Sequence, residues 1–148
     1  MILKEALVEA AMEISQMFGL DMVFQEELEE THQLKADQVN VLMGLTDGLK
    51  GNVILGFKKD TALQVVSSMM GGMEVKELDF MAQSALGELA NMTVGTALMK
   101  IQNESIVNLS PPTVVAGGNV FLTLSGTESK KLLFKLNEKS FNMIYSID

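Results

Sequence analysis

The residues best suited to chemistry lie in the segment GELANMTVG, residues 87–95. Glu88 and Asn91 are three positions apart, so a helix would place a carboxylate and a carboxamide on one face, about one turn apart. A carboxylate accepts hydrogen bonds and pairs with cations, whereas a carboxamide both donates and accepts them. The segment also contains Gly87 and Gly95, although each interior glycine costs a helix about 1 kcal/mol relative to alanine. These poor helix formers require an explanation.

The helix that carries this pair is expected over about residues 77–101. At 100° per residue, six mostly polar positions fall within about 40° of one line. They are Glu77, Ser84, Glu88, Asn91, Gly95 and Gln102. The stripe that should be buried lies broadly opposite and consists of Leu78, Ala82, Ala85, Leu86, Leu89, Thr93 and Ala97.

An ordinary solvated face would explain such a polar stripe. A solvated helix face usually carries several charged residues, often in pairs four positions apart. Between residues 80 and 99, however, Glu88 is the only charged residue. A face with so little charge is better suited to being covered by a partner, and small residues such as Gly87 and Gly95 would let that partner approach closely.

The composition narrows the class of protein. The chain has 148 residues, of which 47% are hydrophobic, so one packed domain over residues 1–148 is expected. A formal net charge of −8 argues against nucleic acid and membrane as partners. The absence of cysteine excludes disulfides and any zinc site built on cysteine. Three glutamates in the first helical segment argue against a secretory signal, so a cytoplasmic location is expected.

The order of periodic segments predicts the fold class. Helices are expected over residues 2–18, 60–70 and 77–101, with Asp60 as the N-cap of the second. Strands are expected over residues 21–30, 37–46, 52–57, 119–124, 131–136 and 141–147, and Pro111 with Pro112 should break any regular element. The resulting order is α-β-β-β-α-α-β-β-β. Because helices and strands come in blocks, this order predicts an α+β fold, an antiparallel sheet with helices packed on one face.

Other polar motifs are interpreted as structural. His32 is the only histidine, has no second ligand at motif spacing, and is expected at the surface. The acidic run at residues 26–30 lacks the spacing and glycine of a calcium loop. Ser84 has no evident base nearby and is expected as a small interface residue and not as a nucleophile. No metal site is therefore predicted.

Several segments together resemble the CheX-like family of chemotaxis phosphatases, which includes relatives of CheC and of flagellar switch phosphatases. They are VNVLMGLTDGLKGNVILGF (residues 39–57), SSMMGG (67–72), LDFMAQSALGELANMTVGTALMKI (78–101) and NLSPPTVVAGG (108–118). The family signature is an acid or Ser, three residues, Glu, two residues and Asn, with a proline about twenty residues later. It falls here on Ser84, Glu88 and Asn91, followed by Pro111 or Pro112.

The resemblance implies dephosphorylation of a CheY-type response regulator that carries a phospho-aspartate. Asn91 would position the attacking water in the regulator's pocket, and Glu88 would pair with the regulator's lysine. Ser84, Gly87 and Gly95 would contact the partner. The regulator would supply Mg²⁺, so no cofactor is expected on this chain. Family members of this length resemble homodimers joined through sheet edges, which makes a homodimer the expected state.

Two alternatives come from other functional classes. A non-catalytic module could bind the response regulator of a chemotaxis or two-component pathway without accelerating hydrolysis. A structural subunit of a flagellar or signalling assembly would need additional partner-binding tails, and none is evident. Some CheC-like relatives carry the motif on two helices, but the first helix here has only Glu13 and Gln16. No activity is assigned to that helix.

Overall fold

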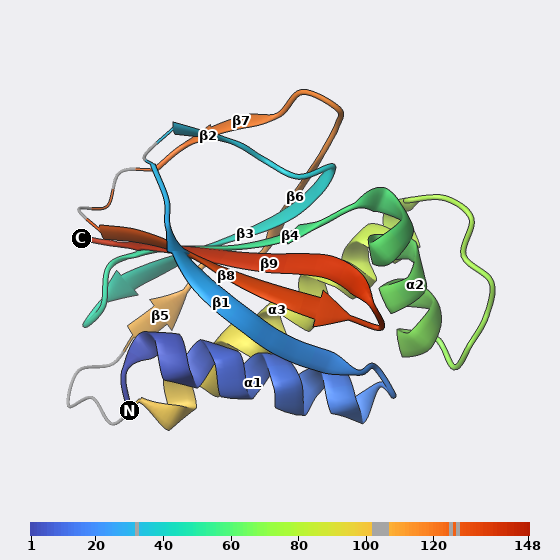
Figure 1. Cartoon of the computed structure of the whole chain (residues 1–148), viewed down its shortest axis with the longest axis horizontal. Helices are drawn as coiled ribbons and strands as arrows, with labels where there is room; N and C mark the ends of the chain where they lie inside the picture. Colours follow the sequence, from blue (N-terminus) through green and yellow to red (C-terminus); the bar gives the residue numbers. More distant parts are fainter. Residues whose placement is uncertain (32, 102–106, 125, 127) are drawn as a thin grey trace.

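A long antiparallel sheet forms the centre of the molecule (Figure 1). The computed structural model describes residues 1–31, 33–101, 107–124, 126 and 128–148. The elements are α1 (Leu3–Met17), β1 (Met22–Glu29), β2 (Gln33–Lys35), β3 (Val39–Asp47), β4 (Gly51–Phe57), α2 (Lys59–Met69), α3 (Phe80–Lys100), β5 (Val107–Leu109), β6 (Thr113–Ala116), β7 (Phe121–Thr123), β8 (Glu128–Leu136) and β9 (Lys139–Ile147).

The main sheet has seven strands in the order β1-β8-β9-β4-β3, and β5 and β6 both pair with the outer edge of β3. Every pairing is antiparallel. The predicted hairpin between β3 and β4 is present, with Val41 opposite Leu55. A two-residue turn, Asn137 and Glu138, joins β8 to β9, and both turn residues have positive φ. Such backbone conformations match the twist of the flanking strands.

The two faces of the sheet bury different residues because side chains alternate along each strand. On β4, Val53, Leu55 and Phe57 belong to the large core that also contains buried residues of all three helices. Ile54 points the other way and packs in a small cluster with Leu34 and Ile144. A two-stranded ribbon of β2 and β7 covers that second face. The helices lie on one face, as predicted (Figure 1).

The predicted order α-β-β-β-α-α-β-β-β is confirmed for the long elements, and three short strands are added to it. No sequence pattern predicted β2, which has three residues and pairs with β7 almost ninety positions away. The prolines at 111 and 112 do interrupt the strand, as expected, but β5 and β6 continue along the same edge on either side of them. Edge positions tolerate proline because one row of backbone groups needs no partner strand.

Two sequence-based expectations fall outside the described residues. They concern His32 and Gln102. Within the described residues, no helix combines the length and hydropathy that a membrane span requires.

Candidate functional site

The candidate site is carried by α3, whose start is defined by a local cap. Asp79 Oδ1 accepts a hydrogen bond from the Ala82 backbone N–H at 2.9 Å, which satisfies one of the unpaired donors at the helix N-terminus. The helix therefore begins at Phe80, three residues later than predicted, and Glu77 precedes it. Asp79 is the capping side chain that the sequence pattern had not singled out.

The predicted faces of α3 are both present. Leu86, Leu89 and Thr93 are buried against the sheet and its neighbouring helices, as expected. Ser84, Glu88 and Asn91 are exposed on the other side, and Gly95 is half-buried. This arrangement follows from 3.6 residues per turn, since positions 84, 88 and 91 lie on one side of the helix.

The outer edge strand bulges where it passes α3. Leu42 pairs with Thr113 and Leu45 with Leu109, so two residues of β3 oppose three residues, 110–112, of the edge strand. Ser110 holds this bulge in place because its Oγ accepts a hydrogen bond from the Gly44 N–H at 2.7 Å. Bulges of this kind redirect the chain locally. Here the bulge carries Pro112 to the side of α3.

The structure corrects the reason expected for Gly87. A Cβ added to Gly87 would lie 3.2 Å from Cγ of Pro112, which is tighter than an ordinary contact. Gly87 is buried, so the space beside it is filled by a proline of the same chain and not left open for a partner. Gly95 faces Leu109, whose Cδ1 would lie 3.9 Å from an added Cβ. Gly87 thus accommodates the edge strand of its own chain, whereas an added Cβ at Gly95 would make only an ordinary contact with that strand.

A surface cavity of about 380 Å³ lies between α3 and this edge strand. It brings together four of the five predicted site residues, Ser84, Gly87, Glu88 and Asn91, whereas Gly95 does not line it. Of the two prolines that fit the family pattern, Pro112 lines the cavity. The site is therefore an open surface cavity lined on one side by α3 and on the other by the bulged edge strand.

Three other lining residues were not anticipated. They are Phe80, Gln83 and Val114. Phe80 could have been found from the sequence, because it lies four positions before Ser84 and eight before Glu88 on the same side of the helix. Val114 could not, because its position depends on the pairing of β6 with β3.

Two polar side chains of the cavity have no polar partner within the described part of the chain. There, neither the Glu88 carboxylate nor the Asn91 carboxamide makes a hydrogen bond or an ion pair. In the same residues, no cluster of three acidic or histidine side chains could hold a metal ion. Both groups are thus free to contact a molecule outside the chain.

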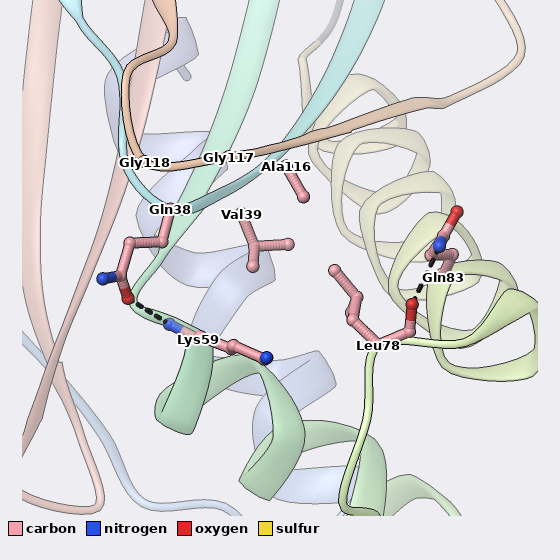
Figure 2. Close-up of a pocket in the computed structure, with 8 residues that line it drawn as sticks. All are labelled: Gln38, Val39, Lys59, Leu78, Gln83, Ala116, Gly117 and Gly118. Atoms are coloured by element: carbon pink, nitrogen blue, oxygen red, sulfur yellow. Dashed lines mark hydrogen bonds between the residues drawn. The ribbon is translucent and has the colours of Figure 1, made fainter.

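Figure 2 shows a second cavity, of about 420 Å³, which shares the lining residue Gln83 with the first. Its wall is formed by Lys59 at the start of α2 and by the loop at Gly117 and Gly118. Gln83 Nε2 donates to the Leu78 carbonyl at 2.9 Å, which ties the segment before α3 to the helix itself. This contact stabilises the start of the helix that carries Glu88 and Asn91.

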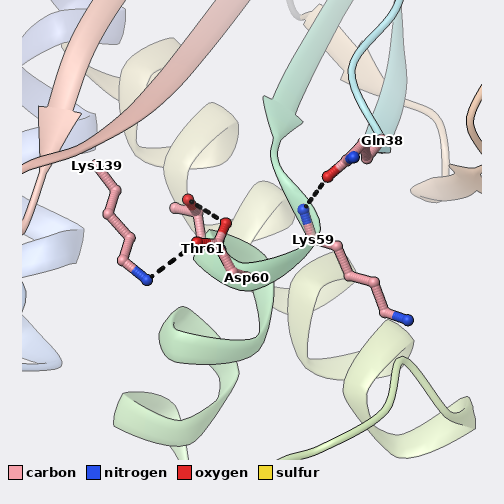
Figure 3. Close-up of polar contacts among 5 residues, drawn as sticks. All are labelled: Gln38, Lys59, Asp60, Thr61 and Lys139. Atoms are coloured by element: carbon pink, nitrogen blue, oxygen red, sulfur yellow. Dashed lines mark hydrogen bonds and ion pairs between the residues drawn. The ribbon is translucent and has the colours of Figure 1, made fainter.

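The start of α2 corrects the expectation that Asp60 is an N-cap. The helix begins at Lys59, and the Lys59 N–H donates to Oε1 of Gln38 at 2.8 Å (Figure 3). Asp60 instead accepts hydrogen bonds from the Thr61 N–H at 2.8 Å and from Lys139 Nζ at 3.3 Å. The bond from Lys139 is the main reason that the pKa of Asp60 is lowered. The cap is supplied by a residue twenty-one positions earlier, which local pattern could not predict.

Of the three glutamates in α1, Glu13 forms an ion pair within the chain. Glu13 Oε1 accepts a hydrogen bond from Lys100 Nζ at 2.7 Å, and this bond raises the pKa of Lys100. The ion pair links α1 to the end of α3. It gives Glu13 a structural contact within the chain, in contrast to Glu88.

Comparison with known proteins places this chain in a family. The family profile described as "Chemotaxis phosphatase CheX" matches residues 39–135. A curated relative, the CheY-P phosphatase CheX of Thermotoga maritima, is 41% identical over 107 residues, which are 72% of this chain and 69% of that protein. The fold and the family profile thus define a phosphatase-type α+β domain. The chain belongs to the CheX family of chemotaxis phosphatases.

Solved structures show the same fold at lower identity. The chemotaxis protein CheX from Desulfovibrio desulfuricans superposes with a TM-score of 0.85 at 22% identity, covering 99% of each chain. A CheX–CheY–BeF₃–Mg²⁺ complex from Borrelia burgdorferi gives 0.83 at 20% identity, covering 99% of this chain and 97% of that one. Thermotoga maritima FliY gives 0.63 at 24% identity, covering 96% of this chain and 83% of FliY.

Proposed function

We propose that this chain dephosphorylates a CheY-type response regulator by hydrolysing its phospho-aspartate. The observation that carries the proposal is the exposed pair of Glu88 and Asn91, which lines one cavity and lacks partners within the described residues. The relative that is 41% identical is named for this activity. We also propose that residues 1–148 form a single domain.

In the proposed reaction, a water attacks the phosphorus and the bond from phosphorus to the aspartyl oxygen breaks. Inorganic phosphate leaves with both protons of the water, and the regulator's carboxylate is restored. Phosphoryl transfer demands little covalent work from the protein, so positioning and charge stabilisation dominate. Asn91 would supply positioning, because its Oδ1 accepts a hydrogen bond from the water. A carboxamide is not a base at neutral pH, so Asn91 orients the water without taking its proton.

Glu88 would supply the anchoring contact. It lies about one turn before Asn91, so its carboxylate can pair with a cation of the partner while Asn91 enters the partner's pocket. A charge-assisted hydrogen bond of this kind contributes about 1.5–3 kcal/mol. Glu88 is the only charged residue between positions 80 and 99, so this contact does not compete with neighbouring charges on the helix. Ser84 and Gly95 would complete the contact as small residues.

The metal requirement of the proposed reaction is assigned to the partner. The solved complex from Borrelia burgdorferi contains CheY, BeF₃ and Mg²⁺ together with CheX. By analogy, Mg²⁺ would be bound by the regulator and would neutralise charge on the transferring phosphoryl group. No cofactor is proposed for this chain.

The proposal is tested by phosphate release from a phosphorylated receiver domain in the presence of Mg²⁺. The parent protein should accelerate release, and Glu88→Ala should raise KM for the receiver as well as slow the reaction. A parent protein that binds the receiver without acceleration would favour the non-catalytic binding module. If neither binding nor acceleration is detected, the proposed function is wrong.

We also propose that the chain forms a homodimer through a sheet edge and acts in the cytoplasm. Within the described residues, β1 pairs on one side only, with β8, and its exposed residues include Val23 and Leu28. An open, partly apolar edge strand is a template for pairing with another chain. Analytical ultracentrifugation should give a dimer for the parent protein. A monomer at micromolar concentration would contradict the dimer proposal without affecting the phosphatase proposal.

A further inference from the structure

An exposed aromatic residue extends the candidate site beyond Glu88 and Asn91. Phe80 is 84% exposed at the first position of α3 and lines the same cavity as those two residues. Within the described part of the chain, its ring makes no aromatic or cation–π contact. A large apolar side chain in that position contributes nothing evident to the core. It is available to a partner.

The geometry of α3 places Phe80 on the functional side. At 100° per residue, Phe80, Ser84, Glu88 and Asn91 lie within about 80° of one another. Phe80 and Asn91 are eleven residues apart, which corresponds to about 16 Å along the helix axis. One small phosphate ester cannot touch both residues at once. An occupant that contacts Phe80 and also reaches Asn91 must be a macromolecule with an extended surface.

The charge distribution indicates how that surface is bound. The stretch from residue 80 to 99 has one charged side chain, Glu88, and the chain as a whole carries a net charge of −8. Long-range attraction to the acidic phosphorylation pocket of a receiver domain is therefore unfavourable. Affinity must come from short-range contacts, and exposed aromatic residues at the edge of a cavity are typical sources of such affinity.

We propose that Phe80 is the apolar anchor through which α3 binds the receiver domain, so that Phe80 determines affinity while Asn91 determines the rate of hydrolysis. The inference rests on the proposed function, because it assigns the same partner to a longer surface. Phe80 makes its contact beside the phosphorylation pocket, where an apolar patch of the receiver domain surrounds the ring. Its contribution is equal in the ground state and the transition state, so losing it changes binding without changing the chemical step.

The test compares Phe80→Ala with a matched variant, Phe121→Ala. Phe121 is also an exposed phenylalanine, at 70%, but it lies in β7 on the opposite face of the main sheet. Binding is measured by calorimetry with CheY of Thermotoga maritima in the presence of Mg²⁺ and BeF₃⁻. Steady-state phosphate release from phosphorylated CheY gives kcat and KM, and thermal unfolding confirms that both variants fold.

Phe80→Ala should raise both Kd and KM about tenfold, which corresponds to about 1.4 kcal/mol, with kcat within about twofold of the parent. Phe121→Ala should change neither constant. If Phe80→Ala keeps the Kd and KM of the parent, or lowers kcat alone, the anchor assignment is wrong while the phosphatase function stands. Equal weakening by Phe121→Ala would also overturn it, because the interface would then not be specific to α3.

The same experiment separates this inference from the proposed function. If the parent protein binds CheY but does not accelerate hydrolysis, the catalytic proposal fails. The ratio of the Kd of Phe80→Ala to the Kd of the parent still tests whether Phe80 is an anchor. If the parent protein binds neither the BeF₃⁻-activated nor the unmodified receiver, both proposals are wrong.

Discussion

Replacing Asn91 with alanine should change stability and activity in opposite directions. Asn91 is exposed in the interior of α3, and in the described residues its carboxamide has no partner, so the change removes no native contact there. Alanine is the better helix former by about 0.5 kcal/mol, so the variant should be slightly more stable than the parent. For a domain of this size, that gain corresponds to an increase in Tm of about 2 °C.

The expected loss of activity is much larger. An acceleration of about a hundredfold corresponds to a barrier lowered by about 2.7 kcal/mol, which one well-positioned amide can supply. Asn91→Ala should therefore abolish most of the acceleration while retaining much of the affinity for the receiver domain. The measurements are single-turnover phosphate release at saturating protein and denaturant unfolding of the same preparations. Met99→Ala, an exposed change in the same helix outside the cavity, is the control and should leave activity unchanged.

Two results would refute this reasoning. Equal rates for Asn91→Ala and the parent would reject the catalytic assignment. A loss of stability of more than about 1 kcal/mol would show that the carboxamide has a structural role in the fold, since an exposed residue without contacts should not destabilise when truncated.

Three further predictions test the local structure. Gly95→Ala should raise the free energy of unfolding by about 1 kcal/mol, because the added Cβ would make an ordinary contact with Leu109 at 3.9 Å. Denaturant unfolding should show a smaller gain in stability for Gly87→Ala, where the added Cβ would lie only 3.2 Å from Pro112. A loss of stability in Gly95→Ala would contradict the open contact. Asp79→Ala should lower Tm by about 3 °C in calorimetry through loss of the helix cap, and an unchanged Tm would contradict that role. Burial, and then nearby glutamates, raise the pKa of Tyr145 to about 12 from 10.0. The chain has one tyrosine and no tryptophan, so the phenolate absorbance reports on Tyr145 alone. It should titrate near pH 12 in the folded protein and near pH 10 in urea. Because only the unfolded state loses this proton between those values, stability should fall over that pH range, and a folded midpoint near pH 10 would contradict the buried position.

The placement of Glu88 and Asn91 on one helix face was predictable because it depends only on local geometry. Glu88 and Asn91 lie on the same side of any regular helix, whatever surrounds it, and the sparse charge between residues 80 and 99 is visible in the sequence. The long strands were predictable for a similar reason. Alternation along β4 already separates Val53 and Leu55 from Ile54, and the structure buries them on opposite faces of the sheet.

The remaining features depend on residues distant in sequence. The cap of α2 comes from Gln38, and the ribbon of β2 and β7 joins segments almost ninety positions apart. Likewise, the residues around Gly87 in the sequence do not indicate that Pro112 fills the space beside it.

The sequence alone determined the class of fold and the helix face that carries the carboxylate and the carboxamide, because periodicity acts over a few residues. Only the tertiary structure decided which other segment of the chain lies beside that face. The bulge of residues 110–112, held by the hydrogen bonds of Ser110 to Gly44, brings the edge strand against α3 and creates the cavity. Pairing with β3, which is distant in the sequence, sets the position of this edge strand, whereas local alternation decides only which face of the sheet each side chain takes.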